Sequence, residues 1–267
     1  MPFDRHDLYE RTVQSPDKVV KFLQSIHGRS PAVLGEDFCG TASLSRAWVR
    51  LVPEGAAVAV DLDASVLERA RGPATSGHLE RIQGDVRDAT DPARHAADLI
   101  FVGNFSIGEI HDRPDLVRYL ARSRERLKPG GVFVCDTYGG ASAFRVGAIE
   151  RSHWIEGGIR IRYVWEQRSA DPFTARVVCA MHFRLERGGE IFQAIEDAFV
   201  YRWRLWSVPE LREAMLEAGF AWTEVRSELY GDPGIGLGVA GDASRATLDE
   251  SEGFIVCVAA HRDGVRR

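Results

Sequence analysis

One stretch near the N-terminus, AVLGEDFCGTA at residues 32–42, constrains the fold of this chain more than any other. It starts as an apolar run typical of a buried strand, and it breaks into small residues around Gly40. A helical pattern follows at once from Ser43 to Val49, so the order is strand, tight turn and helix. A ligand in such a turn can reach the free N–H groups of a helix N-terminus, and glycine lets it approach the backbone closely. The stretch therefore predicts a nucleotide-binding βα unit.

Further apolar runs alternate with helix-sized segments downstream of this unit. The predicted strands span residues 32–37, 56–61, 79–83, 97–102 and 132–136. This alternation predicts a parallel sheet with right-handed crossovers and helices on both faces. Ligands of such sheets bind outside the C-terminal ends of the strands. Polar residues stand at those ends: Glu36, Asp61, Asp85, Asn104 and Asp136.

The hydrophobic period falls to two between residues 158 and 206, where apolar and polar side chains alternate. This pattern predicts an antiparallel three-stranded meander with one wetter face, on which we expect His182 to be exposed to solvent. Ser207 and Glu210 then form a capping-box signature that opens a helix. Two late strands follow, separated by a glycine-rich loop over residues 231–253.

The composition indicates a soluble globular protein, because 45% of the 267 residues are hydrophobic and 27% are charged. A net charge of −5 argues against a nucleic-acid partner, which usually meets a basic footprint. No apolar run approaches the roughly 20 residues that span a bilayer, and the first residues, charged from Asp4 onward, lack an apolar core of signal-peptide length. Four cysteines without a C-x-x-C pair indicate reduced thiols, no metal site and a cytoplasmic location.

Two acidic residues at strand ends suggest nucleoside recognition. Asp61 lies about 20 residues past Gly40, where a carboxylate can accept hydrogen bonds from both ribose hydroxyls. It could instead cap the following helix, although Asp63 is better placed for that. Asp85 could accept a hydrogen bond from an adenine amino group, or it could simply form a turn after Gly84.

Four motifs, in the expected order over residues 32–136, resemble those of class I S-adenosylmethionine-dependent methyltransferases. These are EDFCGTA, which resembles the ExGxGxG loop, VDLDASVLERAR, QGDVRD and RLKPGGVFV. The resemblance implies S-adenosyl-L-methionine as cofactor and a Rossmann-like sheet of five parallel strands plus an antiparallel C-terminal pair. LYERTVQ, EDFCGTA and the WRLW-PELR-GF stretch also resemble an uncharacterised bacterial group of small-molecule methyltransferases. The β-insert is similar to that of small-molecule N-methyltransferases, including those acting on amino sugars and glycine.

The resemblance also implies roles for individual residues. Glu36 would lie near the methionine ammonium, Asp61 at the ribose, and Asn104 near the methionine part. Asp85 and the Val86 amide would read the adenine. Tyr9 would lie in an N-terminal helix that folds over the cofactor, although it could equally be a packing tyrosine. The implied cofactor-binding set is Tyr9, Glu36, Phe38, Gly40, Asp61, Leu62, Asp85, Val86 and Asn104.

One departure from the family pattern concerns the glycine loop. Phe38 and Ala42 stand where the pattern has its first and third glycines. A phenylalanine at positive φ is strained. We therefore expect the loop to pass Phe38 in an ordinary backbone region and to be built around Gly40 alone.

The predicted activity is transfer of a methyl group to a nitrogen or oxygen of a small molecule by in-line displacement. Positioning alone can contribute roughly 7–11 kcal/mol to such a reaction. A base is needed only where the nucleophile must lose a proton. His111 and Tyr138 are the candidate bases, although the first could be a loop histidine that caps the next helix.

We expect four parts: a helical cap (1–30), a cofactor-binding core (31–137), an inserted β lid (138–206) and a C-terminal helix and strand pair (207–267). The lid would offer aromatic walls to the substrate through Trp154, Trp165, Trp203 and Trp206, or these side chains would fill the gap between the meander and the main sheet. A nicotinamide-dependent oxidoreductase is disfavoured because the G-x-G-x-x-G loop is missing. A catalytically idle methyltransferase fold serving as a binding or regulatory subunit remains the alternative. The sequence does not indicate an oligomeric state.

Overall fold

The computed structural model describes residues 3–69, 78–227, 229 and 253–264. Within these residues the chain forms two compact units. The core unit comprises residues 15–137, 206–229 and 256–264, and the β unit comprises residues 3–14, 138–205 and 253–255. Most of the predicted glycine-rich loop, residues 230–252, lies outside the described residues. The division into four parts stays a prediction.

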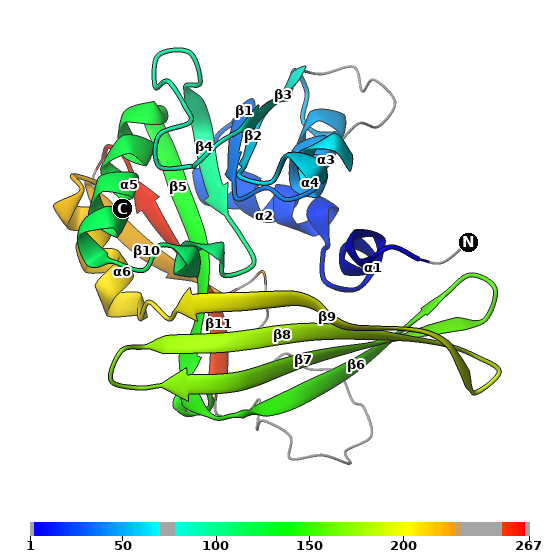
Figure 1. Ribbon diagram of the computed structural model, residues 1–267. Helices are drawn as coiled ribbons and strands as arrows, with labels where there is room; N and C mark the ends of the chain where they lie inside the picture. The colour runs from blue at the N-terminus through cyan, green and yellow to red at the C-terminus, as the bar shows by residue number, and fades with distance from the viewer. Residues whose placement is uncertain (1–2, 70–77, 228, 230–252, 265–267) are drawn as a thin grey trace. The chain divides into compact units, whose positions relative to one another are not determined.

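A seven-stranded sheet in the order β10-β11-β5-β4-β1-β2-β3 organises the core unit (Figure 1). Its strands are β1 (Val33–Asp37), β2 (Ala56–Asp61), β3 (His78–Gln83), β4 (Ala97–Val102), β5 (Leu127–Gly140), β10 (Trp222–Arg226) and β11 (Gly253–His261). Strands β5, β4, β1, β2 and β3 pair in parallel, whereas β10 and β11 pair antiparallel. The predicted fold class is confirmed.

Helices cover both faces of this sheet, as the apolar runs predicted. The helices are α2 (Pro16–His27), α3 (Ser43–Leu51), α4 (Ala64–Arg69), α5 (Arg113–Arg126) and α6 (Val208–Glu217). Alternate residues of β4 face opposite cores: Leu99 packs in a cluster with residues of α2 and α3, and Ile100 packs in a cluster with residues of α5 and α6. Figure 1 shows these two helix pairs on opposite faces.

Local signals in the sequence fix several helix ends. Ser207 and Glu210 form the expected capping box at the start of α6. Helix α2 begins at Pro16 and ends before Gly28, which takes the left-handed conformation with φ of 68°. These ends set the lengths of the connections that lead into the strands.

The β unit contains a four-stranded antiparallel sheet, one strand more than the sequence predicted. The strands are β6 (Gly147–Ile155), β7 (Ile159–Asp171), β8 (Arg176–Arg187) and β9 (Glu190–Arg204), accompanied by α1 (Arg5–Thr12) and the short helix η2 (Ala141–Phe144). The expected alternation holds, because Ile161 and Phe183 pack in a buried cluster with Leu8 of α1. The extra strand, β6, lacks the alternating signal, because its sequence GAIERSHWI mixes polar and apolar residues on both faces.

The expectation that His182 is solvent-exposed was wrong, since only 8% of its surface is accessible. It does lie on the predicted polar face, but acidic side chains of neighbouring strands cover it. Its Nε2 lies 3.2 Å from Glu166 Oε2, and its Nδ1 lies 2.8 Å from Glu196 Oε2. The amide of Asp197 also donates a hydrogen bond to Nδ1, at 3.1 Å.

Two structural features that would bear on function are absent from the described residues. None of the helices in this part of the chain combines the length and the apolar character needed to cross a membrane. In the same residues, no group of three or more His, Cys, Asp or Glu side chains is arranged to hold a metal ion. All four cysteines are buried.

Candidate functional site

The loop after β1 has three residues in the left-handed region of the backbone. Phe38, Gly40 and Ala42 have φ values of 58°, 53° and 54°. The expectation that Phe38 takes an ordinary conformation was therefore wrong: the loop keeps a positive φ at each position where the family pattern has glycine. A left-handed conformation costs a residue with a Cβ about 1–2 kcal/mol. Contacts elsewhere must offset this strain at Phe38 and Ala42.

Asp61, at the end of β2, binds the backbone of this loop at Gly40. Its Oδ2 accepts a hydrogen bond from the Gly40 amide at 2.7 Å, and its Oδ1 accepts one from the Asp63 amide at 2.9 Å. The adjacent Cys39 amide donates to the carbonyl of Val60 at 3.0 Å. Asp61 therefore supports the loop in addition to its predicted contact with ribose. Spacing along the sequence indicated only the second role.

Glu36 is buried beneath the same loop, with 7% of its surface accessible. Its Oε2 accepts hydrogen bonds from the amide and the hydroxyl of Ser45, at 2.8 and 2.5 Å. Burial raises the pKa of Glu36 to about 7, although the bonds from Ser45 act in the opposite direction. Its other oxygen, Oε1, forms no hydrogen bond with a described residue.

The predicted adenine-reading residues follow β2 and β3 side by side. The Gly84 amide donates to the carbonyl of Asp61 at 3.0 Å, which places the turn after β3 against the end of β2. Leu62 leaves 71% of its surface accessible, and Val86 is buried. The Asp85 carboxylate accepts hydrogen bonds from the backbone and the guanidinium of Arg87. These bonds hold the pKa of Asp85 below its usual value.

Two successive left-handed residues, Asn104 and Phe105, follow β4 with φ of 56° and 62°. The buried carboxylate of Asp136, on β5, accepts a hydrogen bond from each of their amides, at 2.8 and 2.7 Å. The short helix η1 (Ser106–Glu109) comes next. Asp136 thus fixes the turn that carries Asn104. The sequence placed Asp136 at this sheet edge without indicating that role.

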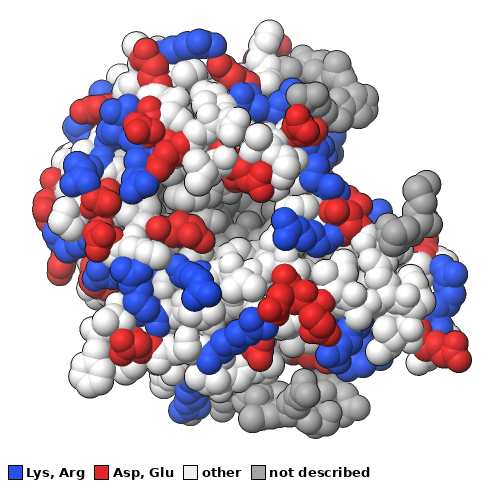
Figure 2. All heavy atoms as spheres, viewed as in Figure 1, with Lys and Arg blue, Asp and Glu red and all other residues white. Residues whose placement is uncertain are grey.

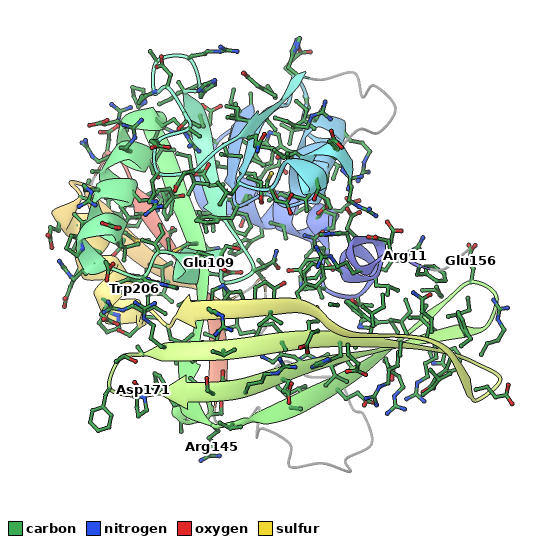
Figure 3. The ribbon with its side chains drawn as sticks, viewed as in Figure 1. Arg11, Glu109, Arg145, Glu156, Asp171 and Trp206 are labelled. Atoms are coloured by element: carbon green, nitrogen blue, oxygen red, sulfur yellow. The ribbon has the colours of Figure 1, made fainter. Side chains whose placement is uncertain are left out.

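His111 is half-buried immediately before α5. The neighbouring Ile110 carbonyl accepts a hydrogen bond from the indole of Trp206 at 2.9 Å. The Trp206 carbonyl in turn accepts one from the Thr137 hydroxyl at 2.8 Å. Figure 3 labels Trp206 and Glu109, which belong to this region. Trp206 is buried in the core unit and supports the segment that carries His111.

Tyr138 lies in the β unit, where a hydrogen bond fixes the direction of its hydroxyl proton. Gln167 donates both hydrogens of its amide to the carbonyls of Ala143 and Arg145, each at 2.8 Å. Its Oε1 can therefore only accept, and the Tyr138 hydroxyl donates to it at 3.1 Å. Burial raises the pKa of Tyr138 well above its usual value, so the phenol stays neutral.

Aromatic side chains stack across β7 and β9 in the same unit. Tyr201 stacks with Trp203 at 4.4 Å between ring centroids and with Trp165 at 5.9 Å. Trp203 is buried, whereas Trp165 and Tyr201 remain partly accessible. Tyr9 of α1 meets the ring of Phe199 edge-on. The structure therefore brings Glu36, Phe38, Gly40 and Asp61 together within the core unit, and it places Tyr9 and Tyr138 in the β unit.

Comparisons with known proteins identify the fold. Residues 37–131 match a family model described as a methyltransferase domain. No curated protein matches the chain. Solved structures match almost all of it. DesVI from Streptomyces venezuelae is 17% identical, with a TM-score of 0.69 over 97% of this chain and 99% of that one.

Two other similar structures carry functional names. The amino pentose methyltransferase CalS10 from Micromonospora echinaspora, solved with bound S-adenosylmethionine, is 15% identical, with a TM-score of 0.68 over 98% of both chains. The sugar N-methyltransferase KedS8 from Streptoalloteichus sp ATCC 53650 is 16% identical, with a TM-score of 0.66 over 98% of this chain and 94% of that one. At these identities the structural likeness establishes the fold alone.

The chain therefore contains a methyltransferase domain, and its predicted resemblance to class I methyltransferases is confirmed. The prediction of a methyltransferase agrees with the family model, and the prediction of S-adenosylmethionine as cofactor agrees with the ligand of the similar CalS10 structure. The roles of individual residues stay predictions.

Proposed function

We propose that this chain, with its methyltransferase domain, moves a methyl group from S-adenosylmethionine to a nitrogen or oxygen of a small molecule by in-line displacement. The observation that carries the proposal is the loop after β1. Its three left-handed positions, 38, 40 and 42, reproduce the spacing of the family's glycines, and the acid of β2 binds the middle one. This arrangement is retained although two of the glycines are not.

The residues present fit the cofactor. A Cβ built on Gly40 would meet no atom within 4 Å, so the backbone there is open to a ligand. Glu36 offers one oxygen without a described partner, and Leu62 offers an exposed apolar side chain beside Asp61. We assign the methionine end to Glu36, Gly40 and Asn104, and the nucleoside end to Asp61, Leu62, Asp85 and Val86, with Phe38 and Tyr9 as further contacts.

When bound, S-adenosylmethionine would supply a methyl group carried on a sulfonium. The leaving group is a neutral thioether, so no acid is needed to protonate it. The chain's own residues then have to position the acceptor, exclude water and, for some nucleophiles, remove a proton. The Tyr138 hydroxyl directs its proton to Gln167 and also lies 3.9 Å from Cys179 Sγ. Its raised pKa makes Tyr138 a poor base at neutral pH. We therefore assign any base role to His111.

Two features support a small-molecule acceptor bearing an amine or a hydroxyl. Similar structures over nearly the whole chain include a sugar N-methyltransferase and an amino pentose methyltransferase. The partly accessible rings of Trp165 and Tyr201 supply apolar surface of the kind that lines small-molecule sites. Figure 2 shows acidic and basic side chains interspersed over the face in view, and the net charge is −5. Neither favours a nucleic-acid acceptor.

The cofactor assignment is tested by calorimetric titration of the purified chain with S-adenosylhomocysteine and S-adenosylmethionine. We expect saturable binding of one molecule per chain. Absence of binding at millimolar cofactor would contradict the enzyme proposal and leave the idle fold as the better description. The acceptor is then tested with a panel of amino sugars, simple amines and their hydroxyl analogues. Release of S-adenosylhomocysteine reports turnover, and NMR of the product separates N-methyl from O-methyl groups.

A further inference from the structure

Asp37, the last residue of β1, is a buried carboxylate paired entirely by α5. Only 1% of its surface is accessible. Its Oδ1 accepts a hydrogen bond from Arg126 Nη2 at 2.8 Å, and its Oδ2 accepts one from the Tyr119 hydroxyl at 2.7 Å. Both partners are also buried, so solvent does not weaken these bonds. The residue that precedes the strained loop is therefore firmly anchored.

Tyr119 contacts the strained residue itself as well as its neighbour. Its ring meets the Phe38 ring edge-on, with 6.4 Å between centroids and 68° between planes. On its other side it meets Phe133 of β5 edge-on at 6.0 Å. One side chain of α5 thus holds the carboxylate of Asp37 by its hydroxyl and the ring of Phe38 by its own ring.

Arg126 is held in place by a second set of contacts. Its Nη1 donates to the Thr90 hydroxyl at 3.1 Å. Its Nη2 occupies the space beside Gly35, where an added Cβ would lie only 2.6 Å away. The missing side chain at Gly35 therefore makes room for the guanidinium. A buried pair of this kind is costly to break on one side only, because it leaves an unpaired charge.

We infer that Tyr119 and Arg126 are positioning residues for the cofactor loop, which keep Phe38 in the left-handed conformation by fixing Asp37. The inference rests on the proposed function of that loop. Strained backbone conformations persist where the surrounding structure over-determines them. Glycine would adopt the same φ without help. The contacts from α5 thus stabilise at Phe38 the positive φ that the family's first glycine adopts without strain.

The inference predicts a coupling between Tyr119 and Phe38, which a double-mutant cycle measures. Tyr119→Phe keeps the ring and removes the hydroxyl, and with it the bond to Asp37. We expect it to raise the Kd for S-adenosylhomocysteine about tenfold in the natural background. In a Phe38→Gly background the same change should raise the Kd about twofold or less, because glycine needs no external hold. Titrations are run well below the unfolding temperature of every variant.

A ligand-free readout separates positioning from loss of stability. Tyr119→Phe should speed backbone amide exchange over residues 36–42 in the absence of cofactor. Thr223→Val is the matched control, because it removes another buried hydroxyl. The Thr223 hydroxyl, on β10, accepts a hydrogen bond from Arg212 Nε at 2.9 Å. The substitution should lower stability while leaving exchange in the loop and the Kd unchanged.

The outcomes are distinguishable. An equal rise of the Kd in both backgrounds, or no rise in either, overturns the inference. Failure of the unmodified chain to bind S-adenosylhomocysteine overturns the proposed function, and loop exchange in ligand-free protein still tests the positioning role. If Tyr119→Phe does not fold, Thr90→Val is the milder perturbation, since it removes only the outer bond of Arg126. An equal loss of affinity for S-adenosylhomocysteine on Thr90→Val in the natural and Phe38→Gly backgrounds would then contradict the inference.

Discussion

Glu36 should make the stability of this protein fall as the pH rises through neutrality, and Glu36→Gln should remove that dependence. The carboxyl is buried, and burial raises its pKa from 4.5 to about 7. Between these two values the folded state holds a proton that the unfolded state has released. The protonated group therefore contributes stability that is complete below about pH 4.5 and is lost as the pH rises through 7. Glutamine keeps the shape and an acceptor for Ser45 but does not titrate.

The size of the effect follows from the two pKa values. Between pH 5 and pH 8 the natural chain should lose about 2.5 kcal/mol of unfolding free energy relative to Glu36→Gln, at roughly 1.4 kcal/mol per pKa unit. Urea denaturation of both proteins at several pH values measures this difference directly. Comparing two variants cancels the titration of every other group to first order.

A difference that stays constant between pH 5 and pH 8 would refute the assignment of a raised pKa to Glu36. Ser45→Ala supplies an internal check, because the bonds from Ser45 lower the pKa of Glu36. Removing the hydroxyl should raise the pKa further and move the loss of stability to higher pH. A shift towards lower pH would contradict the hydrogen-bonding scheme.

Three further substitutions test the site. Asp61→Ala should weaken S-adenosylhomocysteine binding strongly in calorimetry, because it removes both the predicted ribose acceptor and the hold on the Gly40 amide; unchanged affinity would refute both roles. Gly35→Ala should destabilise the fold by about 2–4 kcal/mol in urea titrations, because the new Cβ would displace the buried guanidinium of Arg126; a change below about 0.5 kcal/mol would show that the arginine moves freely. Asp136→Asn replaces one of two acceptors by a donor and should lower cofactor affinity about tenfold, with a loss of about 1–3 kcal/mol in thermal or urea unfolding; retention of both would remove its assigned role.

The alternating strands and helices, their caps and the polar strand ends could be predicted from sequence because each depends on neighbouring residues. The period of three to four residues, the period of two and the capping box at Ser207 are all local signals. The order of motifs along the chain then placed Glu36, Asp61, Asp85 and Asn104 at one edge of the sheet. That edge is where the structure has them.

The conformation of Phe38 could not be predicted in the same way, because its support comes from a distant helix. Tyr119 lies 82 positions from Asp37 in the chain, and nothing in the loop sequence indicates their contact. His182 was misjudged for a similar reason, since the acids that bury it come from β7 and β9. Local strain and local exposure are decided by such tertiary contacts.

Calorimetric titration of S-adenosylhomocysteine into the natural chain and into Gly40→Ala tests the central claim most directly. Gly40 has positive φ and open space where a Cβ would lie, so the alanine should lower stability by only about 1 kcal/mol. The added methyl group would nevertheless occupy the space that we assign to the cofactor. We expect one molecule bound per natural chain and at least about tenfold weaker binding to the variant. No binding to the natural chain, or equal affinity for both proteins, would contradict the assignment of this loop.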